Sequence, residues 1–216
     1  MSKPNILIGP DERQLKNIYA GARGERYDPV CLLDCHLVAI RQLPRVQAAP
    51  AEKRRALAAE LGRRLTAAKP EELRNMRELL NQTVIRQETE SCGFLGLGKR
   101  TVTKRYTEPR PSSRELVNLL RGEAYNAVYR EHQTTPGIDP SRFEDQYENY
   151  YLITASGRLL EVCYTLNWDF NLGGVYDVEW WNCSEVSGET PWICLLVRAA
   201  QVLGAETAEA LCRQYV

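Results

Sequence analysis

The stretch from Tyr147 to Cys183 constrains the fold of this chain most, because it has the densest aromatic and β-branched content of the sequence. Within it, two alternating runs, 149–155 and 158–166, are joined by Ser156-Gly157, and glycine accepts the positive φ of a tight hairpin turn. A third alternating run extends from Val175 to Trp181. The pattern predicts an antiparallel meander of three strands, with a further strand from elsewhere in the chain.

A two-residue turn at Ser156-Gly157 would fix the register of the first two strands, because it places Ala155 opposite Arg158. The pairs expected on one face are Ile153–Leu160, Tyr151–Val162 and Asn149–Tyr164, and those on the other face are Leu152–Glu161 and Tyr150–Cys163. The first face is apolar and is expected to be buried, whereas the second is mixed.

The first 83 residues are predicted to be mainly helical. A short strand is expected at 6–8, and apolar residues at helical spacing predict helices at 11–22, 29–43, 51–68 and 70–82, with Pro44 ending the second helix. After Thr83, two β-branched runs, 84–89 and 100–106, predict a second hairpin.

The remaining segments are predicted to be helices that cover the sheet. Ser112 and Glu115 form a capping box, which predicts a helix from Ser112 to Glu131. The last two helices are predicted at 192–203, ended by Gly204, and at 206–214. We therefore expect an α+β protein in which a helical part, residues 1–83, precedes an α+β part, residues 84–216, with a mostly antiparallel sheet packed against helices; the two form separate domains or one continuous domain.

The composition argues against several classes of function. The 28 basic and 28 acidic residues give a net charge of zero, so no overall field attracts nucleic acid or an anionic membrane. We expect no signal peptide and no membrane span, since the longest apolar run, Trp192 to Val197, is too short. The seven cysteines are an odd number in largely apolar surroundings, which predicts reduced thiols in a cytoplasmic protein of bacterial type.

The glycine-rich segment between the strands of the second hairpin resembles a phosphate-binding loop only in part. Gly93, Gly98 and Lys99 match G-x-x-x-x-G-K-[ST], but Arg100 occupies the hydroxyl position and a strand is expected to follow instead of a helix. We expect no nucleotide cofactor. Instead, we expect this loop to contact a partner protein through exposed apolar and basic residues, namely Phe94, Leu95, Leu97, Lys99 and Arg100.

Three other patterns contain residue types that form metal or catalytic sites. Cys31, Cys35 and His36 lack a second ligand pair, so we expect no metal centre. A catalytic cysteine, Cys92, would need His132 or His36 as its base. An acidic group was also considered as a metal or acid–base site: Glu161, Asp177 and Glu179.

These patterns leave three classes of function open. We expect a non-catalytic module that binds another protein, such as an adaptor, inhibitor or immunity-like protein. The alternative is a small hydrolase or toxin-like effector that uses Cys92 and His132 or the acidic group. A third class is a nucleic-acid binder with a basic helix face between residues 53 and 64, formed by Lys53, Arg54, Arg55, Arg63 and Arg64, although nucleic acid is unlikely as a partner.

Overall fold

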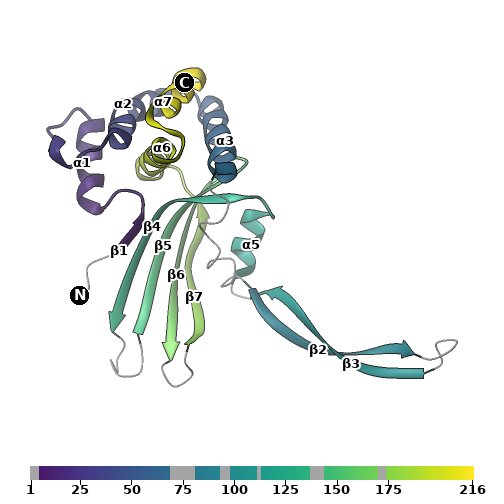
Figure 1. Ribbon diagram of the computed structural model, residues 1–216. Helices are drawn as coiled ribbons and strands as arrows, with labels where there is room; N and C mark the ends of the chain where they lie inside the picture. Colours follow the sequence, from purple (N-terminus) through teal and green to yellow (C-terminus); the bar gives the residue numbers. More distant parts are fainter. Residues whose placement is uncertain (1–4, 69–80, 93–97, 111–112, 137–143, 170–173) are drawn as a thin grey trace.

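The computed structural model describes residues 5–68, 81–92, 98–110, 113–136, 144–169 and 174–216. A five-stranded antiparallel sheet has the order β1-β4-β5-β6-β7, and a separate two-stranded sheet is formed by β2 and β3 (Figure 1). The strands of the large sheet are β1 (Asn5–Ile8), β4 (Tyr125–Pro136), β5 (Glu144–Thr154), β6 (Leu159–Asp169) and β7 (Gly174–Glu185). The predicted α+β class is confirmed.

Five helices gather at one end of the large sheet, as Figure 1 shows. They are α1 (Glu12–Ala22), α2 (Asp34–Ala48), α3 (Ala51–Ala68), α6 (Glu189–Leu203) and α7 (Ala205–Tyr215). A shorter helix, α5 (Arg114–Leu120), contacts β7. Among the described residues, no helix has the length and apolar content required to cross a membrane.

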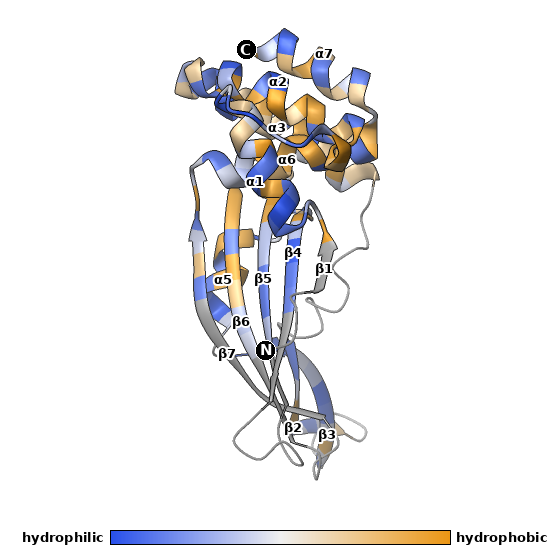
Figure 2. Ribbon diagram, turned by 90° about the vertical axis from the view of Figure 1, so that its left-hand side faces the viewer, coloured by the Kyte–Doolittle hydropathy of each residue, from blue (hydrophilic) through white to orange (hydrophobic). Residues whose placement is uncertain are grey.

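The helix α6 is the centre of the main hydrophobic cluster. Its residues from Pro191 to Val197 are all buried, and they pack with Leu43 of α2, Leu61 of α3 and Ile153 of β5. Apolar colouring is correspondingly dense in the helical end in Figure 2. Burying each large aliphatic side chain contributes about 1.5–3 kcal/mol to the stability of the fold. The cluster contains residues from before and after residue 83, so both parts of the chain share one core.

A second hydrophobic cluster covers the other face of the sheet. Leu116 and Leu120 of α5 pack there with sheet residues, namely Tyr125, Ala127, Tyr150, Leu152, Leu160, Val162 and Tyr164. The central strands are thus buried on both faces near the helical end. The expected contrast between one apolar and one mixed face does not hold there.

The predicted register of the β5–β6 hairpin is wrong by one residue. The loop has three residues and not two: the Thr154 N–H donates to Arg158 O at 3.0 Å, and the Gly157 N–H donates to Thr154 O at 2.9 Å. Gly157 has φ +90°, the left-handed conformation typical of the last position of such a loop. The observed pairs are therefore Ile153–Leu159, Leu152–Leu160, Tyr151–Glu161, Tyr150–Val162 and Asn149–Cys163.

Both predicted boundaries of the second helix are also wrong. The second helix begins at Asp34, after a short 3-10 turn at Pro29–Cys31, and continues through Pro44 to Ala48. Pro44 removes one helical N–H, but burial of Leu43 and Val46 on the same helix offsets that loss.

Of the helix predicted at 70–82, residues 70–80 lie outside the described part, and residues 81–82 belong to a strand.

The helix predicted from Ser112 to Glu131 is helical only in its first half, and its last part is a strand. α5 ends at Leu120, Arg121 and Gly122 both have positive φ, and β4 begins at Tyr125. Residues 125–129 are all buried, so the apolar residues of this strand face both sides of the sheet and resemble a helical stripe. One further strand was expected beside the meander, and the sheet has two, namely β4 and β1, the latter where a short strand was predicted.

Candidate functional site

The hairpin of β2 (Asn81–Cys92) and β3 (Gly98–Pro109), here called the arm, is separate from the body of the protein. Its register is unbroken, from the pair Asn81–Pro109 to the pair Cys92–Gly98. No described strand joins its outer edges, and no arm residue belongs to either hydrophobic cluster. In Figure 1 the arm projects away from the large sheet. It therefore confirms the predicted second hairpin and presents two strand edges that are free to pair.

On one face of the arm, acidic and basic side chains are paired with one another. The Lys104 ammonium lies 3.2 Å from Glu88 and 2.5 Å from Glu90. Arg86 lies 2.5 Å from Glu108 and over the ring of Tyr106, whose hydroxyl donates to Glu88. The hydrogen bonds from Tyr106 and Lys104 hold the pKa of Glu88 below its usual value. On this face the three acidic groups are paired, whereas Arg100, opposite Glu90, has no ion pair among the described residues.

The opposite face of the arm, here called the hydroxyl face, is exposed along its length. It carries Thr83, Ile85, Gln87, Thr89, Ser91, Lys99, Thr101, Thr103, Arg105 and Thr107, which the register places on one side. Ile85 is 60% exposed. The face has no acidic residue, so Lys99 and Arg105 are not neutralised within it. The hydroxyl face therefore presents hydrogen-bonding groups and two cations, Lys99 and Arg105, that a partner molecule could contact.

The two edges of the arm differ in charge. β3 carries Lys99, Arg100, Lys104 and Arg105 against Glu108 alone, whereas β2 carries Arg86 against Glu88 and Glu90. Among the described residues, no ion pair involves Lys99, Arg100 or Arg105. The β3 edge is therefore cationic.

The predicted contact loop is attached to this cationic end of the arm. Lys99 and Arg100 are exposed next to it, whereas Phe94, Leu95 and Leu97 lie outside the described residues. Gly98 and Lys99 lead into β3, so the expected strand, and not a helix, follows the partial phosphate-loop motif. Exposure of the two basic residues is compatible with a contact role, which stays a prediction.

The cysteine and histidine of the predicted catalytic pair belong to different sheets. Cys92 is exposed at the far end of β2, and His132 lies in β4 of the large sheet, away from the arm tip in Figure 1. The other histidine, His36, is buried in α2, where its Nδ1 accepts from the Leu33 N–H at 3.1 Å. Burial lowers the pKa of His36. The structure brings neither histidine to Cys92.

His132 instead belongs to a buried polar cluster that the sequence reasoning missed. Glu148, which is 2% exposed, accepts two hydrogen bonds from Arg130, at 2.8 and 2.9 Å, and lies 2.7 Å from Nδ1 of His132. Arg130 also stacks over the Tyr150 ring. Cross-strand pairing of His132 with Glu148 places the cluster on one face of β4 and β5. The two-residue spacing of Arg130 and His132 was the available signal, but the prediction divided the two residues between a helix ending at Glu131 and the loop after it.

The three acidic residues considered as a site are spread along two strands. Glu161 pairs with Ser184 and accepts from Asn182 Nδ2 at 2.7 Å. Asp177 pairs with Asn167, six positions further along β6, which corresponds to about 20 Å. Glu179 pairs with Thr165, between them. The backbone register thus separates Glu161 from Asp177, and the side chains of Asp177 and Glu179 lie outside the described residues.

The cysteines form no disulfide, and several are buried in the body. Burial raises the pKa of the Cys183 thiol to about 12 and that of Cys212 to about 11, so both stay protonated at neutral pH. Cys31 and Cys35 are half-buried. Within the described part of the chain, no group of three or more histidine, cysteine or acidic residues is arranged to hold a metal ion.

The predicted basic face of α3 is partly neutralised. Glu60 accepts from Arg63 at 2.8 Å and from Arg64 at 2.6 Å, and these arginines hold the pKa of Glu60 below its usual value. Arg54 donates to the Gln47 carbonyl at 2.9 Å. The nucleic-acid interface expected on this face stays a prediction.

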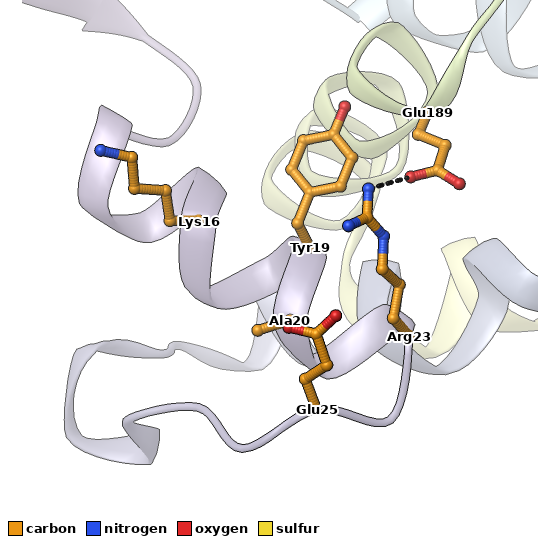
Figure 3. Close-up of a pocket in the computed structure, with 6 residues that line it drawn as sticks. All are labelled: Lys16, Tyr19, Ala20, Arg23, Glu25 and Glu189. Carbon is orange, nitrogen blue, oxygen red and sulfur yellow. Dashed lines mark hydrogen bonds and ion pairs between the residues drawn. The ribbon is translucent and has the colours of Figure 1, made fainter.

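A hollow of about 560 Å³ lies between α1 and the start of α6 (Figure 3). Arg23 lies over the Tyr19 ring and 3.4 Å from Glu189, and Lys16 is paired with Glu12. Burial, with Glu189 nearby, raises the pKa of Tyr19 to about 12. The phenol of Tyr19 therefore stays protonated at neutral pH, and both cations that line the hollow, Lys16 and Arg23, are paired.

Comparison of the chain with models of protein families, with curated proteins and with solved structures finds no match to any of them.

Proposed function

We propose that this chain is a cytoplasmic protein-binding module of the adaptor, inhibitor or immunity-like kind, and that the arm pairs with an extended acidic segment of its partner. The observation that carries the proposal is an exposed two-stranded hairpin that is separate from both hydrophobic clusters. Isolated hairpins are marginally stable in water, whereas three strands stabilise one another. A partner strand would supply the third strand.

The charge of the arm favours the β3 edge as the docking edge. An added strand beside β3 would lie near Lys99, Arg100 and Arg105, which have no ion pair among the described residues. Acidic residues on that strand would pair with these cations across the new ladder. Main-chain hydrogen bonds would supply affinity, and the charges would accelerate association and fix the register.

The first test identifies the partner by photo-cross-linking from a single chosen position of the chain. A photo-reactive amino acid replaces Thr103 on the hydroxyl face, and a matched chain carries it at Lys53 on α3. We expect a protein cross-link from position 103 alone, mapped to an acidic extended segment. If the cross-linked product from position 103 disappears on nuclease treatment, the arm binds nucleic acid instead of a protein.

The second test measures the interaction with the purified partner by calorimetry. Reversal of Lys99, Arg100 and Arg105 to Glu is expected to weaken binding at least tenfold and to reduce its salt dependence. Reversal of Arg26, Lys53 and Arg213 changes the net charge equally but lies on the body. Equal loss in both triple variants would contradict docking on the arm.

A further inference from the structure

A groove of about 290 Å³ lies where α3, the β5–β6 loop and the start of α6 meet, away from the arm. Its walls are the first two turns of α3, the hairpin loop with the start of β6, and the segment that leads from β7 into α6. Three elements distant in sequence therefore converge on one concavity. Its volume is near the lower limit for small-molecule sites, about 300 Å³.

The walls of the groove are held in fixed positions. A Cβ on Gly157 would lie 2.3 Å from the Ala59 nitrogen, and a Cβ on Gly62 would lie 2.1 Å from the Thr154 carbonyl oxygen. The hairpin loop is thus in direct backbone contact with α3. The Val186 N–H donates to Leu159 O at 2.9 Å and holds the third wall to the second. The groove is formed before any ligand arrives.

Three guanidinium groups and one carboxylate line the groove. Arg158 is paired with Glu185 at 2.5 Å. The Arg54 guanidinium donates to the Gln47 carbonyl, which carries no net charge, and Arg55 is exposed; among the described residues, neither arginine has an ion pair. Two positive charges are therefore uncompensated, and guanidinium groups bind carboxylate or phosphate oxygens in bidentate fashion.

Part of the groove lining is apolar. Trp192 is 9% exposed and Leu159 is 7% exposed, and Ala51, Ala58 and Val186 complete this lining. A ligand that fits both parts has a small aromatic body and an oxyanion. We propose that this groove binds a small aromatic phosphate or carboxylate, with its ring against Trp192 and Leu159 and its oxyanion at Arg54 and Arg55.

Calorimetry with four probes tests the proposal on the full chain: phenyl phosphate, benzoate, inorganic phosphate and benzyl alcohol. We expect phenyl phosphate or benzoate to bind at least tenfold more tightly than either inorganic phosphate or benzyl alcohol. The stronger of the two aromatic anions identifies the oxyanion. Failure of both to bind, or binding no tighter than that of inorganic phosphate, would overturn the proposal.

Matched variants locate the site. Arg54→Gln with Arg55→Gln is expected to weaken binding of the preferred aromatic anion at least tenfold. Arg63→Gln with Arg64→Gln removes the same charge from the same helix, outside the groove, and should leave binding unchanged. Ser187→Trp fills the groove without changing its charge and should abolish binding at an unaltered melting temperature. Equal weakening by both arginine pairs, or full binding by Ser187→Trp, would place the ligand elsewhere.

Discussion

The chain contains two hairpins of similar length that occupy opposite environments. β5 and β6 have 11 residues each and are covered on both faces near their loop, whereas β2 and β3 have 12 residues each and belong to neither hydrophobic cluster. The first hairpin carries buried side chains such as Leu152, Ile153 and Val162. The second carries threonines and charged residues at the corresponding alternate positions. Alternation makes a hairpin, but the apolar content of its positions decides whether the hairpin joins a core.

The largest expected difference between the hairpins is in local stability. Arm amides such as those of Val102 and Tyr106 should exchange with solvent after local opening, because few buried contacts oppose it. Amides of Leu152 and Val162 should exchange only on global unfolding, which costs about 5–15 kcal/mol and slows exchange by at least about a thousandfold relative to the arm. Hydrogen exchange followed by mass spectrometry measures both regions in one sample.

The comparison fails if the arm amides are as slow as those of β5 in the purified monomer. Such a result would mean that the arm is packed against another surface, either of this chain or of a second copy. Repeating the measurement at several protein concentrations separates these two cases, because protection from a second copy decreases on dilution.

The next largest effect concerns the loop that fixes the buried hairpin to α3. Gly157→Val combines a left-handed φ with a clash against the α3 backbone at Ala59, so it should lower the free energy of unfolding by about 3–5 kcal/mol. Gly122 also has positive φ, +72°, but no atom lies within 4 Å of its ideal Cβ position. Gly122→Ala should therefore cost only about 1–2 kcal/mol of backbone strain. Thermal and urea unfolding check both variants.

A further variant separates strain from steric contact at the loop itself. Gly157→Ala should be clearly more destabilising than Gly122→Ala, because its Cβ alone meets the Ala59 nitrogen. Equal melting temperatures for the two alanine variants would show that the close approach to α3 contributes little. The groove that this contact shapes would then have a deformable wall.

The sequence predicted the two hairpins, but not how each is used. Ser156-Gly157 marked the correct loop, yet the register depends on the hydrogen bond from Gly157 to Thr154, which no local pattern distinguishes from a two-residue turn. The first part of β4, residues 125–131, was mistaken for a helix because burial on both faces erased its alternation. For the same reason, the cluster around Glu148 could not be assembled before β4 was known to pair with β5. Lys99, predicted in the loop, and Arg100, predicted to begin the next strand, both belong to β3 and are exposed, and their contact role stays a prediction.

An intermediate effect is expected from the ion pairs of the two hairpins. Glu148→Gln removes a buried carboxylate from Arg130 and His132, so it should lower the free energy of unfolding by about 2–3 kcal/mol. Glu108→Gln removes a partner of Arg86 in the arm, where both side chains remain accessible to water, and it should leave the melting temperature unchanged. A comparable loss in both variants would show that the arm contributes to the folding unit as the body does.

The smallest expected effect is the pH dependence of stability that comes from the β5–β6 loop. The Ser156 N–H donates to Glu123 at 3.2 Å, and hydrogen bonding by Ser156 holds the pKa of Glu123 below its ordinary value. The unfolded chain then binds a proton more readily than the folded one, so the stabilisation is present above pH about 4.5 and is lost as the pH falls through the lower folded-state pKa. Glu123→Gln should melt slightly below wild type at pH 7, and the difference should close in acid. A difference that persists unchanged at pH 3 would mean that the charge of Glu123 does not stabilise the loop, and that the contact with α3 holds the loop without it.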